Sequence, residues 1–384
     1  MQHDRYMIYD FAIVGGGIAG TSLAAALAPH RAVAVLERES AWGYHATGRS
    51  AAEFTRRFHG DIVGRLTTAS QGFMLQPPDG FSGTPLLHRR GNLVIAHHDK
   101  AARLDDTAAE EAHTAPPGAS PLERLSPTDA LEHVPFLDPS WLAGALLDPD
   151  CWYIEVESLL QGYRRQARAA GATTELNWAL DRADFANGSW TLGAGESELR
   201  ARVVVNAAGA WADTVAALCG VPTLRLQPLR RTAINLPVDG YDLSTMPEVN
   251  EVDEEFYFKP DAGQLFVSPA DETPVDPHDA WPEEMDIAIA ADHVDQCTTL
   301  EITRVAHSWA GLRTFAPDRL PVVGYDPGHP GFFWYAGQGG YGIQTSSALA
   351  RVGRAAALGE PADGDLLALD IGPERFAPHR FASR

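Results

Sequence analysis

Cysteine, positive charge and long apolar runs are all scarce in this 384-residue chain. Its three cysteines, Cys151, Cys219 and Cys297, lie far apart and form no CxxC pair. The sequence therefore predicts neither a zinc site nor a disulfide framework, and it favours a reducing, cytoplasmic compartment. The N-terminus lacks the apolar run of a signal peptide, and polar residues interrupt the most apolar long stretch, 203–221. We expect no membrane span.

Basic residues are outnumbered, because 30 Lys and Arg face 51 Asp and Glu and the formal net charge is −21. Such a chain would repel phosphates, so we expect no nucleic-acid partner. The acidic surplus fits either attraction of cationic small molecules or simple solubility. His97 and His98 lack metal-ligand spacing such as HExxH, and GRSAA lacks the second glycine of a hydrolase elbow. No metal is expected.

A nucleotide-binding pattern opens the chain. Apolar residues 9–14 lead into a glycine-rich turn, small and apolar residues 21–27 follow as a helix, and 32–37 form a second apolar strand. This order predicts a βαβ unit. With 384 residues and no low-complexity linker, we expect two domains between which the chain crosses more than once.

The turn carries GxGxxG as Gly15, Gly17 and Gly20. The first glycine permits the tight turn, the second lets a pyrophosphate approach the backbone, and the third lets the helix pack on the strand. Glu37 closes the second strand, where a carboxylate can accept hydrogen bonds from ribose hydroxyls. The pattern predicts a dinucleotide site for FAD or NAD. The alternative is a structural turn with Glu37 as a solvated surface acid.

Five further segments carry a family resemblance. They are YHATGRSAAEFT (44–55), VVVNAAGAWAD (203–213), FYFKPDAG (256–263), WAGLRTF (309–315) and AGQGGYGIQTS (336–346). In this order, and with the glycine loop, they extend the resemblance over nearly the whole chain. The sequence resembles the D-amino-acid oxidase/glycine oxidase family of FAD-dependent oxidoreductases, and it looks most like the bacterial D-arginine dehydrogenase branch.

The resemblance implies an α/β (α+β) fold with two parts. One is a discontinuous, Rossmann-like FAD-binding domain, and the other is a substrate domain with a mixed, largely antiparallel sheet. We expect residues 1–85, 145–225 and 310–384 in the FAD-binding domain. Residues 86–144 and 226–309 are expected in the substrate-binding domain.

By the same resemblance, noncovalent FAD contacts a set of glycines and small residues. The implied set is Gly15, Gly17, Gly20, Glu37, Arg38, Ser50, Ala51, Thr55, Ala208, Gly209, Gly311, Gly339, Gly342, Ile343 and Gln344. Asn206 and Ala207 would complete the strand end beside the dinucleotide. Backbone N–H groups at the helix start after QGGYG can stabilise negative charge on a reduced flavin. The alternative is a helix with a crowded start. We expect His45 to be hydrogen-bonded rather than attached to the flavin.

The implied catalytic residues hold an amino acid. Arg313 would bind its carboxylate, since a guanidinium fork matches a carboxylate bidentately and keeps its charge. Tyr257 would meet the same carboxylate, the Gly340 carbonyl would receive the amine, and Arg231 would lie near the side chain or carboxylate. The alternatives are a structural ion pair for Arg313, surface charge for Arg231, since Arg230 suggests a strand with exposed charge, and half-buried packing for Tyr257.

Three positions depart from the D-arginine dehydrogenase branch. Asn92 stands where that branch has an acidic residue for the substrate guanidinium, Glu53 replaces a histidine, and Phe58 replaces a lid tyrosine. Glu53 has three alternatives: it replaces the missing charge, binds the amine itself, or is a surface acid on a helix. The substrate is therefore open among D-arginine, a neutral, apolar or differently charged amino acid, and an N-alkyl amino acid.

The expected reaction is oxidative deamination of a D-amino acid. A hydride passes from Cα to flavin N5, and water converts the imino acid to a 2-oxo acid and ammonia. The alternatives are a secondary-amine (sarcosine-like) oxidase, a 2-hydroxy-acid dehydrogenase and a non-catalytic flavin-binding protein. The expected electron acceptor is a quinone or other carrier, with oxygen left open.

Overall fold

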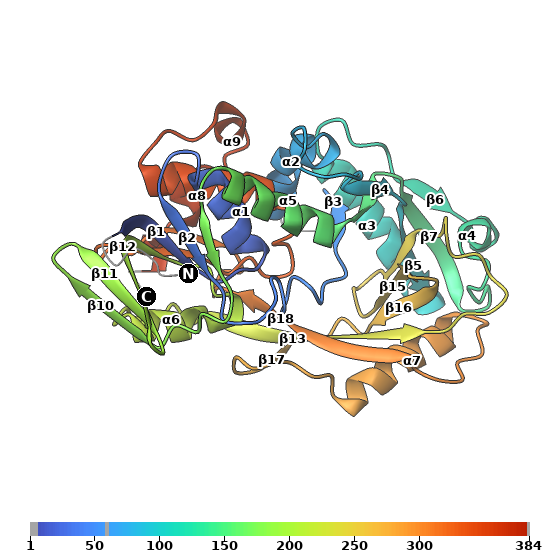
Figure 1. The fold of residues 1–384 in the computed structure, drawn as a ribbon. Coiled ribbons are helices and arrows are strands. Elements are labelled where there is room, and N and C mark those ends of the chain that lie inside the picture. Colours follow the sequence, from blue (N-terminus) through green and yellow to red (C-terminus); the bar gives the residue numbers. More distant parts are fainter. Residues whose placement is uncertain (1–6, 58–60, 382–384) are drawn as a thin grey trace.

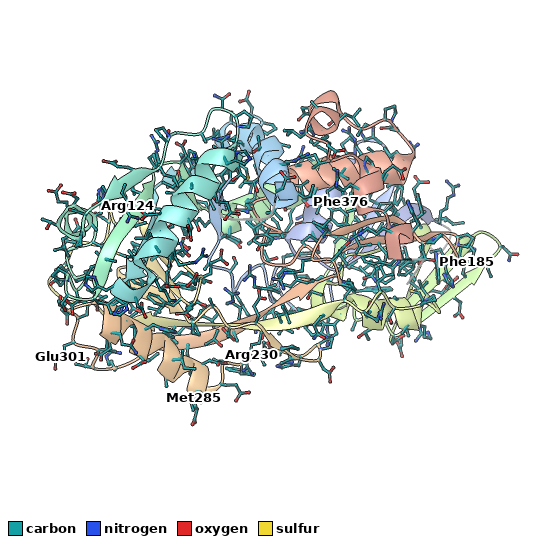
Figure 2. All side chains as sticks on the ribbon, turned by 180° about the vertical axis from the view of Figure 1, so that it is seen from behind. Arg124, Phe185, Arg230, Met285, Glu301 and Phe376 are labelled. Carbon is teal, nitrogen blue, oxygen red and sulfur yellow. The ribbon has the colours of Figure 1, made fainter. Side chains whose placement is uncertain are left out.

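Two large sheets lie end to end in the computed structural model, which describes residues 7–57 and 61–381 (Figure 1). Phe58 lies outside the described residues. In the view from behind, Phe185 and Arg124 mark opposite ends of the molecule, one beside each sheet (Figure 2). The long strands β13 (Gln227–Leu236) and β18 (His307–Phe315) pair with one another and run along one side of the molecule.

The first sheet contains the βαβ unit that the sequence predicts. β1 pairs in parallel with β2 and β12, and β12 also pairs in parallel with β20. Its strands are β1 (Ile8–Val14), β2 (Val33–Leu36), β9 (Thr173–Glu175), β10 (Arg182–Ala186), β11 (Ser189–Ala194), β12 (Ser197–Asn206), β19 (Val322–Tyr325) and β20 (Phe332–Ala336). β2 and β20 are continuous apolar runs, and β1 is apolar from Phe11 onward, because both faces of the sheet are buried there.

Three helices cover one face of this sheet. α1 (Ile18–Leu27) packs against α5 (Val156–Ala169) and α8 (Ser346–Leu358). Leu23 of α1, Leu159 of α5 and Val352 of α8 belong to one buried cluster with β1 and β20 side chains. This packing fixes the positions of the starts of α1 and α8, which both border the site described below.

The second sheet is mixed and largely antiparallel, as expected. β14 and β5 are its parallel pair, and the other pairings among the described residues are antiparallel. Besides β13 and β18, its strands are β5 (Asn92–His97), β6 (Glu123–Leu125), β7 (Leu142–Asp148), β14 (Glu248–Glu251), β15 (Tyr257–Asp261), β16 (Gln264–Ser268) and β17 (Thr273–Pro274). A small third sheet joins β3 (Glu53–Thr55), β8 (Cys151–Ile154) and β4 (Leu87–Arg89).

Strand alternation gives the second sheet one face for the core and one for the site. On β13 and β16, Ile234 and Val267 pack with Val294 of α7 (Glu284–Cys297) in a buried cluster. Neighbouring positions, among them Ala233 and Phe266, line a cavity on the other face. Successive side chains of a strand point to opposite faces, so this division follows from the packing of α7.

The remaining helices lie around these sheets. They are α2 (Asp61–Leu75), α3 (Ala101–Thr114), α4 (Pro127–His133), α6 (Ala212–Leu218) and α9 (Gly364–Ala368), with short 3-10 helices at His98–Lys100, Gly209–Trp211, Pro373–Phe376 and Pro378–Phe381. α4 follows Ser126, with Pro127 in its first turn, where proline suits a helix start. The Ser126 side chain accepts from the Asp129 backbone amide, and Asp129 accepts from the Ser126 amide in return.

Two of the alternatives left open by the sequence are wrong. Glu53 lies on strand β3, not on a helix, because β3 pairs with β8. Arg230 is buried rather than exposed, since its guanidinium meets Glu283 and Asp286 at 2.8 Å each beside α7 (Figure 2). The expected domain limits at 145 and 310 fall inside β7 and β18, and the division into domains stays a prediction.

Within the described part of the chain, no helix combines the length and the apolar character that crossing a membrane requires.

Candidate active site

One cavity of about 820 Å³ lies between the glycine loop, β3, the second sheet and the start of α8. Every catalytic and cofactor residue expected from the sequence lines it, with the exceptions of Gly20 and Asn206. The glycine loop and the Arg313 stretch, three hundred residues apart in sequence, therefore border one space. The volume is within the range of ligand pockets, about 300–1,000 Å³.

The glycine loop needs glycine for two close approaches. Gly15 has φ of +116°, a region that favours glycine, and a Cβ there would overlap the Ala207 carbonyl oxygen. A Cβ at Gly20 would overlap the Gly15 carbonyl oxygen, which places Gly20 between helix and loop and away from the cavity. The first and third glycines of the motif thus have the structural roles that the sequence predicts.

Glu37 is buried, with 7% of its surface exposed, and lies at the end of β2. Its carboxylate accepts from the backbone amides of Gly16 at 2.7 Å and Glu39 at 2.9 Å. The solvated-acid alternative is therefore wrong. Arg38 lies over the Trp211 ring at 5.1 Å, and this part of the cavity wall is polar and aromatic.

His45 borders the same part of the cavity. Its Nε2 contacts Glu39 Oε1 at 3.0 Å, so it has the hydrogen bond expected from the sequence. Ser50 donates to the Thr47 carbonyl at 2.9 Å, and Thr47 Oγ1 accepts from the Ile18 amide at 3.0 Å. Thr47 thereby ties the segment after β2 to the start of α1. It is a contact that the sequence did not single out.

The start of α8 carries an unpaired polar group. The Oε1 atom of Gln344 accepts from the Thr55 amide at 3.4 Å, and its Nε2 is buried without a partner among the described residues. Gly342 and Ile343 line the cavity beside it. A buried amide donor without a partner costs free energy, so a ligand acceptor at this place is favoured. Asn206 takes no part, because its amide donates to the Ala212 carbonyl at 2.7 Å away from the cavity.

These features together fit FAD. The glycine loop permits close approach of a pyrophosphate, Glu37 offers a carboxylate for a ribose, and Gln344 offers a buried amide donor in the same cavity. Small residues also line this cavity, namely Ala51, Ala208, Gly209 and Gly311.

Three arginines converge on one carboxylate at the β13–β18 end of the cavity. Glu272 Oε1 lies 2.9 Å from an Arg319 nitrogen, 3.4 Å from Arg231 and 3.8 Å from Arg313. Glu254 lies close enough for its charge to act on the same three guanidinium groups. Burial, and then the neighbouring Arg231, lower the pKa of Arg313. The positive charge here is only partly compensated, and it would attract an anion.

Arg313 is held against Gly340. A Cβ on Gly340 would overlap the Arg313 guanidinium, so only glycine leaves room for it. The guanidinium carbon also lies 5.6 Å from the centre of the Tyr341 ring. The structural ion-pair alternative for Arg313 is weak, because its contact with Glu272 is the longest of the three.

Arg231 and Tyr257 form the adjacent part of the wall. The Arg231 guanidinium carbon lies 6.0 Å from the centre of the Tyr257 ring, and Arg231 Nε donates to the Asp271 carbonyl at 2.9 Å. On β13 and β18, Arg231 pairs with Gly311 and Leu229 with Arg313. Arg231 and Arg313 therefore share the cavity face of the sheet, whereas Arg230 faces α7.

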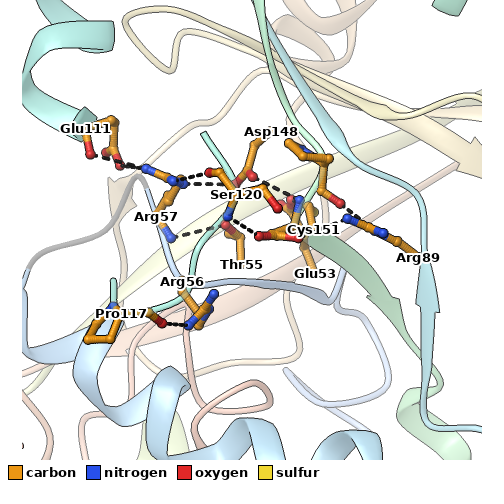
Figure 3. A network of polar contacts seen from close by, with 12 residues as sticks. Glu53, Thr55, Arg56, Arg57, Arg89, Glu111, Pro117, Ser120, Asp148 and Cys151 are labelled. Atoms are coloured by element: carbon orange, nitrogen blue, oxygen red, sulfur yellow. Dashed lines mark hydrogen bonds and ion pairs between the residues drawn. The ribbon is translucent and has the colours of Figure 1, made fainter. Parts of the chain in front are cut away.

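A buried acidic group lies further along the same cavity. The carboxyl groups of Glu53 and Glu248 lie within hydrogen-bonding reach of each other, and the Cys151 thiol donates to Glu53 Oε1. Figure 3 shows Glu53 and Cys151 beside a network in which Arg57 lies 3.7 Å from Asp148. The surface-acid alternative for Glu53 is wrong.

Asn92 lies next to this pair. It is 3% exposed, and its Oδ1 accepts from the Asn250 amide at 3.0 Å. Asn92 pairs in register with Glu248, and both line the cavity. The Glu248 carboxyl thus lies beside Asn92, the position at which the D-arginine dehydrogenase branch has an acidic residue.

Comparisons with known proteins decide the family. The sequence profile of the DAO family, described as FAD-dependent oxidoreductase, matches residues 10–355. The chain belongs to the DAO family of FAD-dependent oxidoreductases. It is therefore an FAD-dependent enzyme, and the expected family resemblance is confirmed. The closeness to the D-arginine dehydrogenase branch stays a prediction.

Relatives of this DAO-family enzyme include a glycine oxidase of Geobacillus kaustophilus, 26% identical over 88% of this chain and 90% of that protein. Its crystal structure superposes with a TM-score of 0.79, at 22% identity, over 94% of this chain and 97% of that one. Human mitochondrial dimethylglycine dehydrogenase is 24% identical over 86% of this chain, which spans 40% of that longer protein. An iminodiacetate oxidase of Chelativorans sp. BNC1 shares the fold, with a TM-score of 0.79 and 22% identity over 96% of this chain and 98% of that one.

Sequence reasoning missed several residues of the DAO-family site. Glu248, Glu272 and Arg319 line the cavity, but none belongs to a motif with a recognisable spacing. Their positions depend on which strands become neighbours. One signal was present: Glu248 and Asn250 are polar residues at alternate positions of a strand, on the face that turned out to be the site face.

Proposed function

We propose that this enzyme oxidises the carbon–nitrogen bond of a small α-amino acid, with a D-amino acid as the first candidate substrate. The observation that carries the proposal is the group of three guanidinium groups around Glu272, beside a cavity that fits FAD. A substrate carboxylate would complete the charge balance there. Relatives named for glycine and dimethylglycine oxidation support a C–NH2 or C–NH donor.

Each residue has a binding or orienting role in this proposal. Arg313 binds the substrate carboxylate bidentately, and the Tyr257 hydroxyl donates to the same group. The Gly340 carbonyl accepts from the amine, and Arg231 adds positive charge beside the carboxylate. Two anchored groups fix the orientation of the substrate. A correct orientation raises the reaction rate by several orders of magnitude.

FAD supplies the two-electron acceptor when it is bound. On the chain's side, Gly15, Gly17, Glu37 and Gln344 are the residues proposed to hold it, without a covalent bond. The amine must be neutral to release electrons from Cα, so a substrate that is an ammonium ion at neutral pH has to lose a proton before oxidation. The product is an imino acid, and water converts it to a 2-oxo acid and ammonia.

A second candidate is an N-methylated amino acid. It is favoured by the relatives, since dimethylglycine and sarcosine dehydrogenases are both among them. Asn92 and Asn250, bonded to each other on the cavity wall, bring no charge that would select a guanidinium side chain. The same Arg313 anchor serves both candidates, and the difference lies in the group on the nitrogen.

The test is anaerobic bleaching of the flavin by a panel of D-amino acids, their L-enantiomers, N-methyl amino acids and 2-hydroxy acids. We expect bleaching by amino acids, lost in Arg313→Ala and retained in the exposed control Arg182→Ala. Bleaching by 2-hydroxy acids alone would overturn the proposal. Purified holoenzyme that no member bleaches would favour a non-catalytic flavoprotein instead.

The electron acceptor and the compartment complete the proposal. A quinone or similar carrier is proposed to reoxidise the flavin, with oxygen as the alternative, and a cytoplasmic location is proposed from the sparse cysteines. Repeating the bleaching in air tests the acceptor: a return of the yellow colour within seconds of substrate exhaustion would indicate an oxidase.

A further inference from the structure

Glu53 and Glu248 form a buried carboxyl pair that the proposed function does not use. Glu53 lies on β3 and Glu248 begins β14, so the pair joins two sheets. The two carboxyl groups lie within hydrogen-bonding reach of each other. Two carboxylates offer only acceptors, so this contact is favourable when one proton lies between them. The pair therefore holds one proton and one negative charge, and it has room for a second proton.

Neighbouring groups and burial set the pKa values of the two carboxyl groups. Burial is the main cause that raises the pKa of Glu53 and raises that of Glu248 well above its usual range. The Cys151 thiol donates to Glu53, and burial keeps the pKa of this thiol well above its ordinary value. Lys259 is the cation that acts on both carboxyls, and it is 6% exposed.

Charged and titratable groups face the pair from every element packed around it. Lys259 comes from β15, Cys151 and Tyr153 from β8, and Asp148 from β7. The negative charge of Asp148 slightly raises the pKa of Glu53. Asp148 itself lies 3.7 Å from Arg57.

The pair separates the main cavity from a second, smaller one. Glu53 and Glu248 are the residues common to both linings among the described residues. The smaller cavity has a volume of about 10 Å³, room for roughly one water molecule. Lys259 and the partly exposed Arg90 also border it. Polar groups thus continue from the pair to a partly exposed residue.

Sheet register places the pair next to the proposed substrate. Asn250 pairs with Tyr257 across β14 and β15, and Glu248 lies two residues before Asn250 on the same face of β14. Two residues along a strand span about 7 Å. Glu53 is anchored from the other side, because the Thr55 amide on the same strand donates to Gln344.

We propose that Glu53 and Glu248 together act as the proton acceptor for the substrate ammonium group. This inference rests on the proposed amine oxidation. An N–H bond of the ammonium breaks, its electron pair stays on nitrogen, and an O–H bond forms on the pair. The pair changes from one bound proton to two and from charge −1 to neutral. The extra proton then leaves to water through the smaller cavity.

The test follows anaerobic flavin reduction in the holoenzyme against pH, at saturating substrate, in Glu53→Gln and Glu248→Gln. At neutral pH we expect a loss of about 100-fold or more, the usual contribution of a positioned base. The loss should disappear above the pKa of the free substrate amine, where the neutral amine binds directly. An equal loss at every pH, or no loss, would overturn the proposal.

The matched control is Glu251→Gln. Glu251 is buried on the same strand and lines the same cavity, but its carboxylate is paired with Lys100 at 2.9 Å. Its pH profile should keep the wild-type shape. Cys151→Ala is a second variant that leaves both carboxyls in place. Loss of the thiol donor should shift the acidic limb of the profile to higher pH, because that hydrogen bond lowers the pKa of Glu53. An unshifted limb would count against the proposal.

A readout independent of turnover is infrared spectroscopy of the shared proton. The wild-type protein at neutral pH should show the C=O stretch of a protonated carboxyl, and either Gln substitution should remove it. A wild-type spectrum from which neither substitution removes a band would refute the shared proton.

The proposed function and the proposed proton acceptor are refuted by different results. A wild-type protein whose flavin no amine reduces would refute the proposed function. Reduction by an amine with an unchanged pH profile in Glu53→Gln would refute only the proton acceptor.

Discussion

Replacement of Gly340 by alanine tests the substrate anchor with a single methyl group. The backbone φ of Gly340 lies outside the left-handed region, so alanine can adopt it without strain. The added Cβ would overlap the Arg313 guanidinium, which would have to withdraw by about 2 Å to reach an ordinary separation of about 3.5 Å. The perturbation therefore acts on one side chain and leaves the fold intact.

The size of the effect follows from the hydrogen bonds at stake. A displaced guanidinium keeps at most one of its two bonds to the substrate carboxylate. A hydrogen bond to a charged group contributes about 1.5–3 kcal/mol, so loss of one weakens binding about 10- to 150-fold. We expect KM to rise by this factor, with a further fall in kcat because the substrate is held by fewer contacts.

The assay is steady-state kinetics with the best substrate of the panel, together with FAD content from absorbance. Gly72→Ala is the control, because a Cβ there meets no atom within 4 Å. In an Arg313→Ala background, Gly340→Ala should cost little more, since both changes remove the same anchor. Full additivity of the two losses, or a wild-type KM in Gly340→Ala, would refute the reasoning.

Three further changes probe other parts of the site. Glu37→Gln should raise the Kd for FAD about tenfold or more, because the two backbone amides and the ribose lose a charged acceptor; titration of the apoprotein by flavin fluorescence measures it, and an unchanged Kd contradicts it. Tyr257→Phe should raise KM about 10- to 150-fold with kcat little changed, the effect of one hydrogen bond to a charged group; steady-state kinetics would exclude this role if kcat alone falls. Burial raises the pKa of Glu248, so the stability that this group contributes is present below its unfolded pKa and is lost as pH rises through the folded pKa. Glu248→Gln should therefore gain melting temperature over wild type as pH rises above the ordinary glutamate pKa of about 4.3, and a gain that does not grow with pH would disprove it.

The local elements were predictable because each depends on a short stretch of chain. The glycine loop, the helix after it and Glu37 form a unit within thirty residues, and their spacing alone requires a tight turn and a strand. The helix start at Ser126 likewise follows from the capping chemistry of that one residue and its neighbours.

The identity of Arg313, Tyr257 and Gly340 as partners came from family resemblance and not from spacing. What the structure adds is the reason for Gly340: its missing side chain is the space that the Arg313 guanidinium fills. Arg230 and Arg231 show the limit of sequence reasoning. They are adjacent and alike, yet one faces α7 and the other the cavity, because a strand turns successive side chains to opposite faces.

The sequence by itself determined the nucleotide-binding unit, the mixed character of the second sheet and the family. Only the tertiary structure decided that Glu53 meets Glu248, that three arginines share Glu272, and that Asn92 lies beside a carboxyl. These contacts join residues up to about two hundred positions apart on different strands. Local sequence restricts backbone conformation within a few residues, whereas the pairing of distant strands is set by the packing of the whole chain.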